Sequence, residues 1–167
     1  ACMLLAYGAT AEKRYRPRLQ MMLGLLLEWQ RPNGTWGYPG GNTDLSNTQY
    51  AALGLWVAQK AGLKVPTNVW QKLVEGTIDH REEPAMAKRS VGKGTGAAKV
   101  EVAGFAYRPP HLGKPTHGHH MITGSMTTAG IAILKICEIG MGRRLRKAAR
   151  RRITAGIDGG VNWMARN

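Results

Sequence analysis

Three segments of the chain carry apolar side chains at the spacing of one face of an α-helix. They run from Leu19 to Leu26, from Val69 to Ile78 and from Ile153 to Met164. Within each segment the apolar residues recur at intervals of three and four positions, and polar or charged residues separate them. This pattern predicts three amphipathic helices, each with one face in the core and the other in water.

Two further segments are apolar on nearly every side. The residues from Tyr50 to Ala58 carry no charge, and neither do those from Met126 to Leu134. Helices of this kind must be buried on most sides. Ser46 and Ser125 precede them and are expected N-caps, because a serine hydroxyl can accept a hydrogen bond from a free N–H group of the first turn. The alternation predicts an all-α array in which charged outer helices cover apolar inner ones.

The two apolar helices belong to an internal repeat. A loop from Gly34 to Tyr38 precedes the first helix start, and a similar loop from Gly104 to Tyr107 precedes the second. Each helix start reads Ser-x-Thr, and the two copies lie 79 residues apart, counted from Ser46 to Ser125. The repeat divides one domain over residues 1–167 into units at about 13–62, 66–141 and 148–167, of which the last is truncated. Both chain ends fall within apolar stretches, which predicts a fragment of a longer protein.

An insert over residues 84–124 interrupts the second unit. Its first part is rich in Lys, Gly and Ala, and its second part, from Arg108 to His120, is rich in His and Pro. The residues from Lys99 to Val102 alternate between polar and apolar and predict a short strand. The rest of the insert is expected to be a mobile excursion over one end of the array.

Composition narrows the class of protein. The chain has 167 residues, of which 43% are hydrophobic, and 24 Lys and Arg against 10 Asp and Glu give a net charge of +14. The apolar content suffices for one core and disfavours intrinsic disorder. No apolar run reaches the roughly 18 residues that a membrane span needs. Two cysteines exclude a disulfide scaffold and a four-thiolate zinc site, and they leave the cellular compartment open.

Seven of the 24 basic residues lie between Arg143 and Arg152, with no acid among them. Such a run suits a polyanion, such as nucleic acid, or an anionic membrane surface. At about 100° per residue, however, these charges surround a helix instead of lining one face. A solvated turn leading into a helix is therefore the favoured interpretation.

One loop resembles a known family motif. The residues Gln30-Arg31-Pro32-Asn33-Gly34-Thr35-Trp36 fit the Gln-x3-Gly-x-Trp pattern of the squalene–hopene cyclase, oxidosqualene cyclase and protein prenyltransferase superfamily. The loop at Gly104 and Phe105 resembles a second copy without the Gln, and a third copy would begin at Trp163. The resemblance implies a partial arc of an α/α toroid, with inner helices around a central cavity. The motif residues that it implies are Gln30, Gly34, Trp36, Ser46, Thr48, Gly104, Phe105, Ser125 and Thr127.

The residue types suggest what this motif does. A Gln at the end of an outer helix can bond to exposed backbone groups of a neighbouring helix end. Gly34 permits a tight bend, and Trp36 buries a large apolar face. We expect the motif to clasp adjacent units together.

Class II cyclases carry an acid motif, Asp-X-Asp-Asp-Thr, at the start of an inner helix. The residues Asp44-Leu45-Ser46-Asn47-Thr48 resemble it, but Ser46 stands where the proton donor would be. A serine hydroxyl is too weak an acid to protonate an alkene. Asp44 is a weak catalytic candidate and suits a cap better. The resemblance thus implies a non-cyclising binding or scaffold domain; the alternative is a fragment of a class II terpene cyclase whose acid motif lies outside this segment.

The expected partners are an apolar or isoprenoid small molecule, another protein, and the remaining repeats of a parent chain. Candidate binding residues are aromatics of the inner helix and residues of the loops at the cavity rim: Tyr50, Trp56, Tyr107, His119 and His120. For Trp56, plain packing is the favoured role. The prenyltransferase zinc ligands cannot be carried over, since no Asp-x-Cys pair exists, and Cys137 suits a small buried hydrophobe. The segment His117-Gly118-His119-His120 matches no standard zinc spacing, so neither a metal nor a cofactor is expected.

Overall fold

The computed structural model describes residues 13–90, 97–113 and 118–167, and this part of the chain is predominantly helical. The all-α expectation is confirmed at that level. The elements in chain order are η1 (Lys13–Tyr15), α2 (Arg16–Glu28), α3 (Leu45–Lys60), α4 (Thr67–Asp79), β1 (Ala85–Ser90), β2 (Ala97–Val102), η2 (Pro110–Leu112), η3 (Gly118–His120), α5 (Gly124–Met141), η4 (Gly142–Arg144) and α6 (Lys147–Met164). Among the described helices, none combines the length and the apolar character that crossing a bilayer demands.

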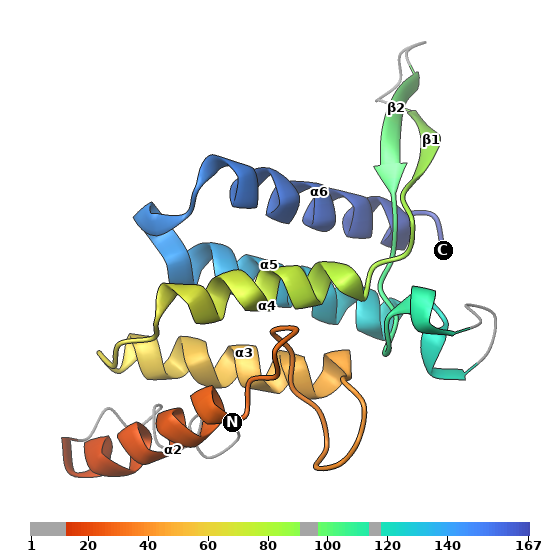
Figure 1. Cartoon of the computed structure of the whole chain (residues 1–167). Helices are drawn as coiled ribbons and strands as arrows, with labels where there is room; N and C mark the ends of the chain where they lie inside the picture. Colours follow the sequence, from red (N-terminus) through yellow and green to blue (C-terminus); the bar gives the residue numbers. More distant parts are fainter. Residues whose placement is uncertain (1–12, 91–96, 114–117) are drawn as a thin grey trace.

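The long helices alternate in direction. α3 and α5 run the same way and lie side by side, whereas α4 and α6 run the opposite way (Figure 1). α5 is central, since it packs against α3, α4 and α6, while α2 packs on α3. The loops before α3 and α5 and the β-hairpin all gather at one end of the array, and the α3–α4 and α5–α6 turns lie at the other.

The core is centred on the two uncharged helices. Leu45 and Leu55 of α3 and Ile133 and Leu134 of α5 are fully buried. Each helix nevertheless keeps one exposed edge, which in α3 includes Tyr50 at 52% exposure. The expected burial on most sides is therefore observed, with a single open stripe per helix.

The predicted N-caps are wrong by two residues. Asp44 caps α3, because its side chain accepts a hydrogen bond from the Asn47 N–H, and Thr123 caps α5 by accepting from the Met126 N–H. Ser46 and Ser125 already lie inside the helices, where their hydroxyls cannot reach back to the free N–H groups. The extended backbone that a cap requires occurs at the earlier residues, with φ −143° at Asp44 and −134° at Thr123.

The predicted apolar stripe of α6 is only half buried. Ile153 is fully buried, but Val161 and Met164 at the other end are 48% and 44% exposed. Gly156 and Gly160 face α5 instead, and a Cβ atom on either would lie within 3 Å of an α5 side chain. The close approach of the two helices thus depends on small residues, which an apolar pattern does not reveal.

The insert begins with an antiparallel β-hairpin that projects from the array (Figure 1). β2 confirms the predicted strand at Lys99 to Val102. Its partner β1, with Ala85 opposite Val102 and Ser90 opposite Ala97, lies where a mobile excursion was expected. The expectation of a mobile segment is therefore wrong for Ala85–Ser90. Residues 91–96 and 114–117, to which the same expectation applied, lie outside the described residues. β1 escaped prediction because Ala-Met-Ala-Lys-Arg-Ser has no strand pattern of its own, and pairing with β2 defines it.

Candidate functional site

The two repeat loops hold the starts of α3 and α5 with the same hydrogen bonds. The Trp36 N–H donates to Thr48 Oγ1 at 3.1 Å, and the Phe105 N–H donates to Thr127 Oγ1 at 3.0 Å. The carbonyls of Trp36 and Phe105 in turn accept from the N–H groups of the two N-cap residues, at 3.3 and 3.2 Å. The aromatic loop position and the threonine of Ser-x-Thr are therefore equivalent in the two units.

Gln30 links the end of α2 to α4. Its Nε2 atom donates to the Val69 carbonyl in the first turn of α4 at 3.0 Å and to the Gly34 carbonyl at 3.1 Å. Trp36 is 5% exposed, and its Nε1 atom donates to the Leu26 carbonyl at 2.9 Å, which occupies one of the free acceptors at the end of α2. Gly34 has φ +86°, a conformation that disfavours side chains.

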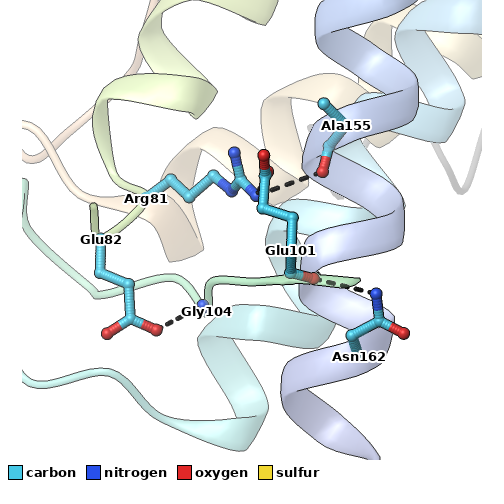
Figure 2. A network of polar contacts seen from close by, with 6 residues as sticks. All are labelled: Arg81, Glu82, Glu101, Gly104, Ala155 and Asn162. Atoms are coloured by element: carbon cyan, nitrogen blue, oxygen red, sulfur yellow. Dashed lines mark hydrogen bonds and ion pairs between the residues drawn. The ribbon is translucent and has the colours of Figure 1, made fainter. Parts of the chain in front are cut away.

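Arg81 fills the equivalent position in the second unit. Like Gln30, it lies two residues beyond its helix end, and its Nη2 atom donates to the Ala155 carbonyl of α6 at 3.2 Å (Figure 2). It also forms an ion pair with Glu101 of β2. Glu82 accepts from the Gly104 N–H at 2.7 Å, which closes the base of the hairpin (Figure 2). The hairpin thus separates Arg81 in the sequence from the loop at Gly104 and Phe105. Because of this separation, the sequence spacing did not reveal the second side-chain link between helices.

Asp44 is used as a hydrogen-bond acceptor at the start of α3. Its carboxylate accepts from the Asn47 N–H at 2.6 Å, from Asn47 Nδ2 at 2.7 Å and from Ser46 Oγ at 2.9 Å. The residue is 2% exposed. These bonds suit a cap. The structure thus gives Asp44 the geometry of the cap role that the sequence favoured.

A cavity of about 470 Å³ opens between the end of α2, the loop after it and the start of α3. Its walls carry four aromatic rings, together with a few polar groups. Tyr50 is the sequence candidate among these rings, and Trp29 and Tyr38 were missed. Three of the rings are 52–65% exposed. The lining residues with ring or polar side chains are Trp29, Arg31, Trp36, Tyr38, Asn47 and Tyr50, and we call this cavity the aromatic pocket.

The remaining sequence candidates lie outside the aromatic pocket. Trp56 is partly buried against the core, with Lys60 Nζ 5.7 Å from its ring centre. Tyr107 contacts the start of α3, where its carbonyl accepts from the Leu45 N–H, and its ring centre lies 5.0 Å from that of His119. Burial raises the pKa of the Tyr107 phenol. His120 lines a separate cavity of about 260 Å³.

Within the described residues, no three His, Cys, Asp or Glu side chains come together as metal ligands would. His120 Nδ1 lies 2.8 Å from the Pro109 carbonyl, whereas His117 lies outside the described residues. Cys137 is fully buried, and this burial raises the pKa of its thiol. The structure therefore places Cys137 as the buried hydrophobe that the sequence suggested.

The buried histidine at the end of α4 was not anticipated. His80 is fully buried, with Nδ1 3.2 Å from the Ala106 carbonyl and no hydrogen-bond partner for Nε2 among the described residues. Burial lowers the pKa of His80 below its usual 6.5, although the charges of Asp79 and Asp44 oppose that shift. Only the tertiary structure reveals that His80 is buried, because the loop around Ala106 that contacts it is distant in the sequence.

The lowered pKa of His80 predicts acid sensitivity. Because the unfolded chain binds the proton more tightly, the free energy of unfolding should be constant for this group above about pH 6.5 and fall below it, by up to about 1.4 kcal/mol per pH unit. Denaturant titrations between pH 7.5 and 5.5 measure the slope. His80→Gln should flatten it, whereas His119→Gln, at an exposed position, should leave it unchanged. If the His80→Gln variant kept the slope of the wild type, the acid sensitivity would not arise from His80.

A scan against models of protein families matches none of them to this chain, and searches of curated proteins and of solved structures return no match.

Proposed function

We propose that this chain is an arc of an α/α toroid that binds an apolar, isoprenoid-like molecule without cyclising it. In this proposal α3 and α5 are inner helices, and α2, α4 and α6 are outer helices. The repeated loop hydrogen bonds and the side-chain links from α2 to α4 and from α4 to α6 support the arrangement. The exposed edges of α3 and α5 would then face the central cavity, where the remaining repeats of a parent chain complete the ring.

The aromatic pocket is the observation that carries the binding role. Trp29, Tyr38 and Tyr50 are large, exposed rings around one cavity of about 470 Å³, which falls in the range of small-molecule sites. Rings of this kind bury apolar ligand surface at low entropic cost, because they have few rotatable bonds. Arg31 donates to the Tyr38 carbonyl at 3.0 Å and so fixes the loop that forms one wall.

The absence of a suitable proton donor at the two helix starts favours binding over cyclisation. At the first start, Ser46 occupies the family's donor position and its hydroxyl donates to Asp44. At the second start the cap is Thr123, and no carboxylate accompanies it. The alternative function is a class II terpene cyclase whose acid motif lies outside this segment, for which the same rings would stabilise carbocations.

Farnesol titration tests the proposal. The emission of Trp29, which is 65% exposed, should shift to shorter wavelength as the ligand excludes water. Tyr50→Ala should weaken farnesol binding by about tenfold or more, since one buried ring contributes roughly 1.5–3 kcal/mol. Met86→Ala removes a large exposed apolar side chain from β1, outside the pocket, and should leave farnesol binding unchanged. Equal affinities for the wild type and Tyr50→Ala would contradict the proposal.

Incubation of a full-length parent protein with squalene separates the two functions. We expect squalene to be recovered unchanged. A cyclic product would instead support the alternative, in which the acid motif lies outside this segment.

A further inference from the structure

Three chain segments that are distant in sequence meet at the end of the array opposite the hairpin (Figure 1). The Arg16 guanidinium, at the start of α2, donates to the Ala61 and Gly62 carbonyls of the α3–α4 turn at 3.2 and 3.3 Å. Gln59 Nε2, at the end of α3, donates to the Gly140 carbonyl at the end of α5 at 3.0 Å. We call this face the basic end and define it by residues 13–18, 60–66 and 142–151.

The basic end concentrates the positive charge of the molecule. These ranges contain half of the chain's 24 Lys and Arg residues and no Asp or Glu. Several acidic residues lie at the opposite end: Asp44 caps the start of α3, Asp79 ends α4, Glu82 accepts from the Gly104 N–H at the base of the hairpin, and Glu101 lies in β2. Glu138 of α5 is paired with Lys135 and Arg150. The basic end therefore presents positive charge from three segments, whereas the run from Arg143 to Arg152 accounts for only one of them.

The run from Arg143 to Arg152 divides into two groups. Arg150 and Arg152 form ion pairs with Glu138 and Glu75. Arg143, Arg146 and Arg151 are exposed, and none of them forms an ion pair with a described acidic residue. Within the described part of the chain, no carboxylate neutralises these three guanidinium groups, so their counterions come from the solvent. A bound polyanion would release those counterions, with a gain in entropy.

We propose that the basic end binds the phosphate backbone of double-stranded nucleic acid without sequence specificity. Three helix turns at interaxial spacings of about 8–10 Å give a face roughly 20–30 Å wide. Duplex DNA offers about one charge per 1.7 Å of its axis, so several phosphates fall within this width. Most of the basic residues are arginines, whose planar guanidinium groups pair with phosphate oxygens in a bidentate manner.

The apolar residues of the two turns argue against a membrane as the partner. Leu63, Val65 and Leu145 are only 2–8% exposed, so they are directed into the core. A helix or turn that lies in a bilayer surface needs exposed apolar side chains to enter the acyl boundary. Charge without exposed apolar groups in these turns favours a rigid polyanion over a lipid surface.

Fluorescence anisotropy with a labelled 20-base-pair DNA duplex tests the proposal in increasing salt. The wild type should give a linear plot of log affinity against log salt with a slope of about −4 to −5. The triple variant Arg143→Gln, Arg146→Gln and Arg151→Gln should bind about tenfold or more weakly, with a slope shallower by about 3. Lys60→Gln with Lys64→Gln, more than 70 positions earlier in the chain, should also weaken binding and reduce the slope by about 2.

A matched control removes equal charge from the other end of the molecule. Lys88→Gln, Lys99→Gln and Arg166→Gln should leave the affinity within about twofold, and circular dichroism should show every variant folded. If this control lost as much DNA affinity as the triple arginine variant, net charge alone would explain the binding. That result would overturn the proposal. Full retention of binding in the Lys60 and Lys64 variant would overturn the three-segment face. Binding at 0.15 M salt to vesicles with 30% phosphatidylserine, with none to DNA, would assign the face to a membrane.

Discussion

Gly76→Ala is expected to lower the free energy of unfolding by about 2–3 kcal/mol, although alanine is the better helix former. Gly76 lies in the middle of α4, where the loop of the first unit rests on the helix. A Cβ atom there would lie 2.4 Å from the Asn33 carbonyl oxygen and 2.6 Å from Thr35 Cγ2. The backbone of the loop cannot yield without weakening the Gln30 link to the same helix. Urea titration followed by circular dichroism measures the change.

Gly24→Ala is the matched control for this variant. Gly24 also lies inside a helix, α2, but a Cβ atom there would meet nothing within 4 Å. Alanine should therefore stabilise the protein by about 0.5–1 kcal/mol through backbone entropy and helix propensity. If Gly76→Ala were stabilising by the same amount, the loop would not pack on α4 as described.

Trp36→Ala is expected to be the second severe substitution, at about 3–5 kcal/mol. The side chain is 5% exposed, so its removal leaves a large cavity beside the core, and the Leu26 carbonyl loses its donor. Trp36→Phe should cost less, because the ring packing is largely kept and the main loss is one hydrogen bond of about 1 kcal/mol. Chemical denaturation of both variants measures the two contributions.

Trp29→Ala provides the comparison within the same loop. Trp29 is 65% exposed and has little surface buried in the core, so its replacement should change stability by less than about 1 kcal/mol. Equal destabilisation by the two tryptophan variants would contradict the distinct roles given to them. The pair also separates folding from binding, since Trp29 belongs to the aromatic pocket and Trp36 both lines that pocket and links α2 to its loop.

The two units show how one structural task is met by different residues. Gln30 follows α2 and donates to a backbone carbonyl of α4, and Arg81 follows α4 and donates to a backbone carbonyl of α6. Trp36 and Phe105 both donate their N–H to the threonine of the following helix. What is repeated is the hydrogen-bond pattern, and the side-chain identities change around it. A motif search that requires Gln and Trp therefore finds the first unit. It misses the second unit, where Arg81 and Phe105 occupy the corresponding positions.

Some residues of the candidate site could be predicted from the sequence and others could not. Tyr50 was identified because the family resemblance implies that its helix lines a cavity, which an aromatic ring could face. Trp29 and Tyr38 carried no such signal, since exposed loop aromatics are common. His119 and His120 were grouped by proximity in sequence, yet the structure separates them from the aromatic pocket.

The amino-acid sequence by itself determined the helices, the alternation of charged and apolar ones, the 79-residue repeat and the strand from Lys99 to Val102. These features depend on interactions between residues a few positions apart, which periodicity records directly. Only the tertiary structure decided the second strand, the arginine in the glutamine position, the buried His80 and the basic end. Each of these depends on segments that are far apart in the chain and meet only when the helices pack, so no local pattern encodes them.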